Sequence, residues 1–220
     1  MLNQAILVFL KELRDNNNRE WFHINKKKYE EAKKGFELFI ELSIEQIKAF
    51  DPNISGLRAK DCLFRIYRDV RFSEDKRPYK TNFGAFVSKN GRKSSYGGYY
   101  IHIEPGQCFL GGGCYMPASN VLKAIRTEIF HHPEEFRGII ENSEFKSHFT
   151  EMYGEKLKTA PRGFPKDFEH IDLLNYKHYA VSKMIDDKTV ISDQFVQEID
   201  NSFKALQPLN RFLNEIVQDL

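Results

Sequence analysis

Apolar residues near the start of the chain recur at spacings of three and four. Leu2, Ile6 and Leu13 belong to this series, and such spacing predicts an amphipathic helix with one buried face. The same period continues over residues 25–50, which predicts a second, longer helix. We expect that helix to end before Pro52, because proline disfavours helical geometry in the residue that precedes it.

The period of the pattern changes to two between Cys62 and Met116. Apolar and polar residues alternate there, as they do in strands whose two faces meet different surroundings. Pro105 and Gly106 separate two of these stretches and are typical of a tight turn. The predicted strands cover residues 62–72, 83–87, 98–104 and 108–116.

Helical spacing returns after Met116. We expect helices over residues 119–129 and 133–140, then a loop-rich stretch, and a final helix from about Asp193 that bends near Pro208. These elements predict an α+β fold: an antiparallel sheet of about four or more strands, within residues about 62–116, packed by N-terminal and C-terminal helices. No repeat or Gly/Ser-rich linker interrupts the pattern, so we expect one domain over residues 1–220.

The composition is that of a chain that can build a core and carries little net charge. Hydrophobic residues make up 41% of the 220 residues, and the formal net charge is +2, which by itself indicates neither nucleic-acid nor membrane binding. The three cysteines, Cys62, Cys108 and Cys114, form no CxxC pair, which favours a reducing, cytoplasmic compartment. We expect no metal site and no cofactor, because the sequence has no typical His/Cys ligand pattern.

Cationic residues are concentrated between Arg65 and Lys80. On a strand, Arg65, Asp69 and Arg71 would share one face. Two guanidiniums beside a carboxylate suit a phosphate or carboxylate ligand, whereas a solvated, self-paired surface is the alternative. Arg68 falls on the apolar face, and because an unpaired buried guanidinium is costly, it predicts an acid or a ligand beside it.

The loop of residues 73–80 is long for a connection between neighbouring strands. Lys76 and Lys80 lie in this loop, from which they would close over a bound anion. The alternative is an ordinary surface turn whose shape is set by Pro78.

A histidine lies between two polar residues on another predicted strand. Tyr100, His102 and Glu104 alternate along the chain and would share one face. His102 titrates near neutrality, and Glu104 would select its tautomer, which makes His102 a candidate general acid or base. A histidine with a structural role is the alternative.

The residues from Phe64 to Lys80 follow the pattern Phe-Arg-Ile-x-Arg-Asp-x-Arg-Phe-Ser-x-Asp-Lys-x-Pro-Tyr-Lys. With the segments 17–22, 98–103 and 111–117, this pattern resembles the bacterial and fungal DUF2461 family, a domain of unknown function, over essentially the whole chain. The resemblance implies that the motif residues act together. It implies no activity, cofactor or catalytic residue.

From the residues we expect a pocket on the sheet that binds a small phosphorylated or carboxylated ligand. The expected ligand-binding residues are Arg65, Arg68, Asp69, Arg71, Lys76, Lys80, Tyr100 and His102. His102 and Asp69 are the candidate catalytic residues if the pocket also catalyses a reaction, which the sequence does not decide.

A nucleic-acid-binding module is the alternative, with phosphates on the basic hairpin 65–80 and bases stacked on Trp21, Tyr67 or Tyr79. A protein-binding adaptor is a third possibility. The sequence predicts no membrane association and leaves the oligomeric state open.

Overall fold

The computed structural model of the protein describes residues 2–220. Helices form both ends of the chain and a group in its second half, as the spacing of apolar residues predicts. Their bounds are α1 Gln4–Asp15, α2 Arg19–Ile24, α3 Lys26–Lys48, α4 Ala59–Cys62, α5 Ser119–His131, α6 Pro133–Ile140, α7 Ser143–His148, α8 Ile171–Leu174, α9 Asp187–Val190 and α10 Gln194–Gln218, with a 3-10 turn at Pro52–Ile54.

Four antiparallel strands form one open sheet in the order β1-β2-β3-β4. They are β1 Phe83–Ser88, β2 Gly98–Ile103, β3 Phe109–Cys114 and β4 Tyr179–Met184. The register pairs Gly84 with His102, and Tyr100 with Gly111. The predicted α+β class, with an antiparallel sheet and helices from both ends of the chain packed on it, is confirmed.

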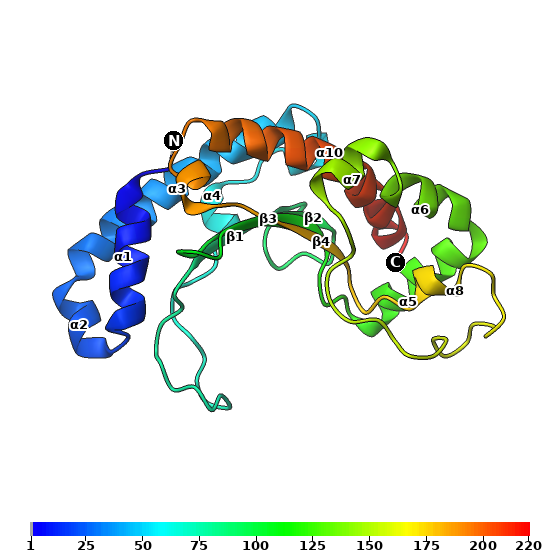
Figure 1. Cartoon of the computed structure of the whole chain (residues 1–220), viewed down its shortest axis with the longest axis horizontal. Helices are drawn as coiled ribbons and strands as arrows, with labels where there is room; N and C mark the ends of the chain where they lie inside the picture. Colours follow the sequence, from blue (N-terminus) through cyan, green and yellow to red (C-terminus); the bar gives the residue numbers. More distant parts are fainter. Residues whose placement is uncertain (1) are drawn as a thin grey trace.

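The two longest helices cover one face of the sheet. α3 packs against β1, and α10 against β3 (Figure 1). Side chains that point toward these helices are fully buried, among them Ala85, Tyr99, Ile101 and Leu110. In Figure 1 the other face is concave, with α1 and α2 at one end and α5 and α8 at the other.

Capping residues explain where the first helices begin. The side chain of Asn3 accepts a hydrogen bond from the main-chain N–H of Ala5, and that of Asn18 accepts one from Trp21, which satisfies N–H groups that have no partner inside a helix. The predicted apolar face of α1 is buried. α10 continues through Pro208, whose missing N–H leaves one helical hydrogen bond unmade.

The segment predicted as the first strand, residues 62–72, is not a strand of the sheet. Its main chain makes only isolated bridges, Leu63 with Ala85 and Tyr67 with Tyr79. Pro78 opposes it and has no N–H to donate, which interrupts a regular ladder. Phe72, the last residue of the predicted strand, is 95% exposed. The sheet's fourth strand is instead β4, far along the chain.

Residues 64–80 therefore form a protrusion, here called the arm. It extends from the edge of the sheet beside α1 and α2 (Figure 1). Short main-chain hydrogen bonds join its two limbs, Arg68 to Pro78 and Lys80 to Ile66. In the part of the chain that the structure describes, no helix is both long and apolar enough to cross a membrane.

Candidate functional site

A cavity of about 570 Å³ opens on the face of the sheet that the helices leave uncovered. Alternate residues of the strands point into it, as the two-residue period of a strand requires. Phe86, Tyr100, His102 and Phe109 line this cleft. Gly111 contributes no side chain: a Cβ there would lie 2.5 Å from the carbonyl oxygen of Val181, so close pairing of β3 with β4 requires glycine.

Three side chains of β2 and its end form a continuous chain of polar contacts along the cleft. The Tyr100 hydroxyl lies 3.0 Å from His102 Nδ1, and His102 Nε2 lies 3.2 Å from Glu104 Oε2. The Thr81 hydroxyl donates to the other Glu104 oxygen at 2.5 Å. The expected shared face of Tyr100, His102 and Glu104 is therefore present, and the three side chains touch.

The hydrogen-bond roles in this chain follow from the acceptor character of the carboxylate. Glu104 can only accept when ionised, so His102 Nε2 carries the proton and Nδ1 accepts from Tyr100. Burial lowers the pKa of His102 against the opposing influence of Glu104, and the charge of Lys80 lowers it further. His102 is neutral at pH 7, and its contact with Glu104 is a hydrogen bond rather than an ion pair.

The surroundings of this chain are aromatic. The His102 ring stacks on Phe109, with centroids 4.5 Å apart and planes at 17°. Phe64 meets the Tyr100 ring edge-on, at 6.1 Å. Burial, with the charge of Glu104, raises the pKa of Tyr100 to about 12.

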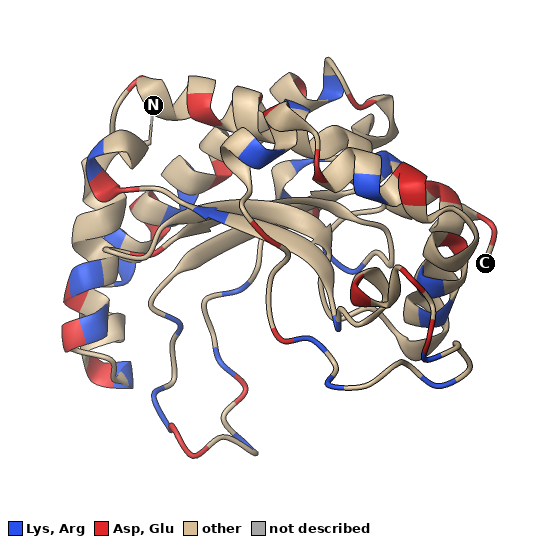
Figure 2. Ribbon diagram, turned by 45° about the vertical axis from the view of Figure 1, so that its right-hand side comes forward, with Lys and Arg blue, Asp and Glu red and all other residues tan. Residues whose placement is uncertain are grey.

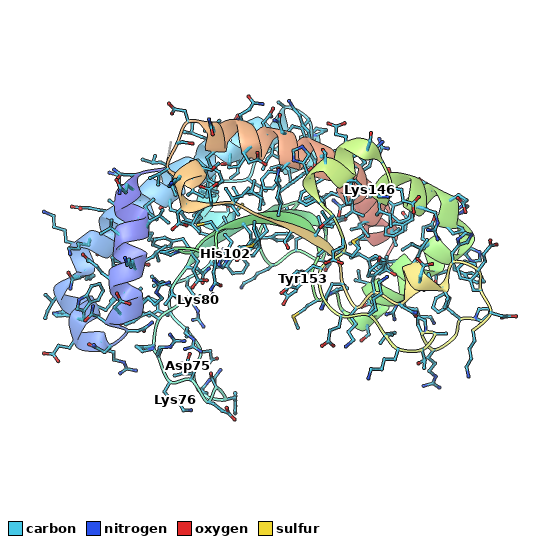
Figure 3. All side chains as sticks on the ribbon, in the orientation of Figure 1. Asp75, Lys76, Lys80, His102, Lys146 and Tyr153 are labelled. Carbon is cyan, nitrogen blue, oxygen red and sulfur yellow. The ribbon has the colours of Figure 1, made fainter. Side chains whose placement is uncertain are left out.

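Lys80 lies at the edge of the cleft beside this chain, with the charge of Arg65 nearby. The Lys80 ammonium is 5.4 Å from the centre of the Phe64 ring, which lines the cleft. Burial and the nearby positive charge of Arg65 lower the pKa of Lys80. Across residues 2–220, neither cation forms an ion pair with an acid, unlike Arg68, Arg71 and Arg77. Figure 3 shows Lys80 and His102 on the same, open side of the sheet.

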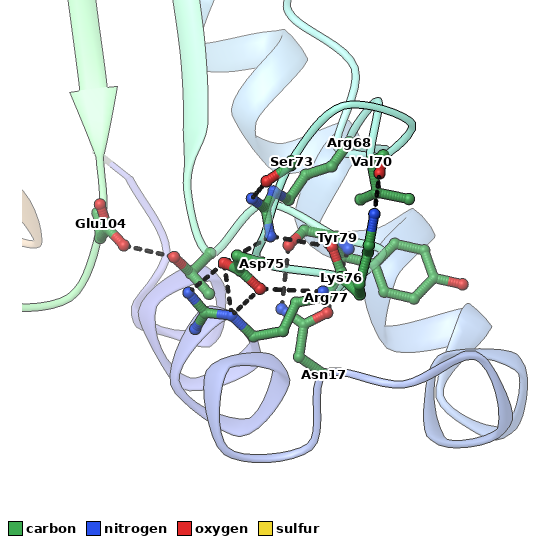
Figure 4. A network of polar contacts seen from close by, with 10 residues as sticks. Asn17, Arg68, Val70, Ser73, Asp75, Lys76, Arg77, Tyr79 and Glu104 are labelled. Atoms are coloured by element: carbon green, nitrogen blue, oxygen red, sulfur yellow. Dashed lines mark hydrogen bonds and ion pairs between the residues drawn. The ribbon is translucent and has the colours of Figure 1, made fainter.

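The other predicted ligand-binding residues lie farther out and contact residues of the arm itself; Figure 4 shows the contacts of Arg68 and Lys76. Arg68 contacts Asp75 at 2.7 Å, and Arg71 contacts Asp69 at 2.7 Å. Lys76 donates to the carbonyl oxygen of Val70. The sequence predicts an acid or a ligand beside Arg68, and Asp75 is that acid. The Arg68 side chain is 24% exposed. The structure brings Lys80, Tyr100 and His102 together, and places Arg65 near both Lys80 and Asp69. Arg68, Asp69, Arg71 and Lys76 do not reach the cleft.

The base of the arm is fixed to the junction of α1 and α2. Asn17 donates to the carbonyl oxygen of Tyr79 at 3.0 Å and accepts from its N–H at 3.1 Å. Trp21 stacks on Phe9. Tyr79 is buried, so of the three proposed base-stacking residues only Tyr67 is half exposed, at 50%.

The far wall of the cleft comes from residues that the sequence analysis does not predict to bind a ligand. Tyr115, Met116 and Tyr153 line it, and the Tyr115 and Tyr153 rings meet edge-on at 5.8 Å. Tyr153 belongs to the loop-rich stretch, where no periodic signal marks it. Met116 follows β3, and its N–H donates to His178 Nδ1 at 3.1 Å.

The cysteines take no part in this site as nucleophiles. All three are free and buried. Burial raises the pKa of Cys62, Cys108 and Cys114 to about 12, so the thiols stay protonated at neutral pH.

Fold and site together define an α+β protein with an open antiparallel sheet and an aromatic cleft on its uncovered face. The chain belongs to the family described as Conserved hypothetical protein (DUF2461), whose family model matches residues 5–212. The resemblance seen in the motif is thereby confirmed. No curated protein and no solved structure matches the chain.

Proposed function

We propose that the protein binds a small ligand with one anionic group and one flat apolar part in the cleft on the open face of the sheet. The proposal rests on Lys80, which lies beside an aromatic cavity of about 570 Å³ and has Arg65 nearby. Within residues 2–220 neither cation forms an ion pair with an acid. Pockets of this size and mostly apolar lining are typical of small-molecule sites.

Charge supports an anion rather than a cation as the polar part of the ligand. Lys80 is half-buried beside Arg65 and loses part of its hydration, so an anion there gains charge-assisted hydrogen bonds. Glu104, the nearby acid, already accepts from Thr81 and His102. The rings of Phe64 and Phe109 supply surfaces for the apolar part.

Calorimetric titration with 1-naphthyl phosphate tests this function, with 1-naphthol as the probe that lacks the charge. We expect Lys80→Gln to weaken binding of the phosphate roughly tenfold and to leave binding of 1-naphthol unchanged. Lys76→Gln is the matched control, because Lys76 lies on the arm outside the cleft. Equal affinities in the wild type, Lys80→Gln and Lys76→Gln would contradict the proposal.

A nucleic-acid role is the second candidate, and one feature favours it. The arm exposes Phe72 and Tyr67 among six Lys and Arg residues and only three acids within residues 65–80 (Figure 2), a combination suited to bases and phosphates. Three of those six cations are already paired with the arm's acids. Affinity for single-stranded oligonucleotides that falls steeply with salt would support this candidate.

A purely protein-binding role has less support. It calls for an exposed apolar patch without a cleft near the cations. The cleft beside Lys80 favours a small ligand instead.

A further inference from the structure

The chain of polar contacts along β2 contains groups that are not needed to bind an anion. A binding pocket needs donors near Lys80, but Tyr100, His102 and Glu104 form a hydroxyl–imidazole–carboxylate series in which each member contacts the next. Its carboxylate end is fixed by Thr81. Its hydroxyl end belongs to Tyr100, which lines the cleft.

The order of groups is that of an activated nucleophile. In such a series the base accepts the proton of the hydroxyl, and the carboxylate orients the base and stabilises it once it is charged. His102 Nδ1 is the acceptor that faces the Tyr100 hydroxyl at 3.0 Å, because Nε2 donates to Glu104. The Asn82 side-chain amide lies farther from the same nitrogen, at 3.4 Å. The hydroxyl also has the room it needs: a Cβ at Gly84 would lie 2.7 Å from it.

We propose that Tyr100 is a catalytic nucleophile toward an anionic ester bound in the cleft. The Tyr100 oxygen forms a bond to the acyl or phosphoryl centre, and the bond from that centre to the leaving oxygen breaks. The Tyr100 proton moves to His102 Nδ1 and then to the leaving oxygen, which takes the bonding electron pair. His102 is the general base, and Glu104 is a positioning residue. Water later cleaves the tyrosyl ester: its oxygen bonds to the acyl or phosphoryl centre, the bond to the Tyr100 oxygen breaks, and that oxygen takes back a proton.

The protonation states agree with these roles. Burial raises the pKa of Tyr100 to about 12, with Glu104 and Tyr115 as the charges that face it, so the phenol needs a base to react at neutral pH. Burial and Lys80 lower the pKa of His102 while Glu104 opposes them, so the imidazole is free to accept a proton.

The inference rests on the proposed function, since the cleft must admit the ester, and 4-(fluorosulfonyl)benzoate tests it directly. This anionic probe forms an oxygen–sulfur bond with an activated tyrosine and releases fluoride, and peptide mass spectrometry locates the label. We expect Tyr100 to react faster than the more exposed Tyr115. His102→Gln should slow its labelling roughly 100-fold, whereas Tyr67→Phe, on the arm, should change nothing.

The pH profile of labelling separates a proton-accepting role of His102 from a merely structural one. In the wild type the labelling rate should rise with pH until His102 is neutral and then level off. Because the pKa of His102 is lowered, this should happen at a lower pH than for an ordinary histidine. In His102→Gln it should keep rising toward the pKa of Tyr100, about 12. Labelling of Tyr100 no faster than Tyr115, or an unchanged profile in the variant, would overturn the proposal.

If His102→Gln does not fold, the tautomer of His102 in the wild type still tests the proposal. Long-range ¹H–¹⁵N NMR must show the His102 proton on Nε2, and the opposite tautomer would refute the proton transfer from Tyr100 to Nδ1.

The two proposals can fail separately. Binding of 1-naphthyl phosphate without Tyr100 labelling would contradict only the nucleophile. Labelling of Tyr100 by neutral phenylmethylsulfonyl fluoride without any phosphate binding would sink only the anion site. Hydrolysis of mono-4-nitrophenyl succinate, an acyl ester with a free carboxylate, against 4-nitrophenyl phosphate separates acyl from phosphoryl esters.

Discussion

The ring of Tyr79 stacks on the ring of Phe22, with centroids 3.9 Å apart and planes at 14°. Asn17 holds the main chain of Tyr79 with two further hydrogen bonds. Because Lys80 follows Tyr79 directly, these contacts fix the position of Lys80 at the edge of the cleft. The α1–α2 junction is thus part of the architecture of the site.

Asn17→Ala should destabilise the protein by roughly 1–3 kcal/mol, because it leaves two half-buried main-chain groups of Tyr79 without partners. Urea denaturation measures this loss. Asn120→Ala is the control, since Asn120 is exposed on α5, and it should change the free energy of unfolding by less than about 0.5 kcal/mol. Equal effects of the two substitutions would show that Asn17 does not hold the arm.

The Asp75 carboxylate should titrate well below an ordinary aspartate. Hydrogen bonds from Arg77, and then the contact with Arg68, lower the pKa of Asp75. We expect Arg77→Gln to raise this pKa more than Arg68→Gln does, because Arg77 is the larger cause. Carboxyl ¹³C NMR titration of the three proteins gives the order directly, and no difference between the variants would contradict the network in Figure 4.

The lowered pKa of Asp75 also predicts how the stability of the protein depends on pH. A carboxyl group whose pKa is lower in the folded state stabilises that state above its unfolded pKa, ~3.9 for aspartate, and the contribution is lost as the pH falls further. The wild type should therefore exceed Asp75→Asn in stability at pH 7, and the difference should shrink toward pH 2. Asp167→Asn, at an exposed position, serves as the control. A gap that widens on acidification would reverse the assignment.

Gly84→Ala should destabilise the sheet by about 1–3 kcal/mol. The added methyl group would lie 2.7 Å from the Tyr100 hydroxyl, so the Tyr100 side chain has to shift. Thermal or urea unfolding measures the loss.

A double substitution checks the cause of that loss. Combining Gly84→Ala with Tyr100→Phe removes the clashing oxygen, so the pair should recover part of the stability that Gly84→Ala costs. Additive losses would mean that the glycine is needed for another reason.

The fold was predictable where packing follows a regular period. α6 begins and ends at the predicted residues 133 and 140, because its apolar residues face a single core. β4 was missed because Lys183, on its helix-covered side, breaks the apolar pattern; only the structure supplies its partner, Glu198 of α10. The alternation of Ile66 and its neighbours predicts a strand over residues 62–72, but Pro78 opposes them and interrupts the ladder.

The site was predictable only in its local part. Tyr100 and His102 lie two residues apart on one strand, and that spacing alone places them on one face. Asp69 and Arg71 also meet as their spacing suggests, but Asp75 binds Arg68 and Arg77, and ion pairing within the arm withdraws these cations from the cleft. Tyr153 reaches the cleft through tertiary packing, which no local pattern reports.

Titration of the ¹⁵N-labelled protein with 1-naphthyl phosphate, followed by NMR, tests the location of the site most directly. We expect the largest chemical-shift changes at Lys80, Tyr100, His102 and Phe109, and their loss in Lys80→Gln. Changes confined to the arm around Phe72, or no changes at all, would contradict a ligand site in the cleft.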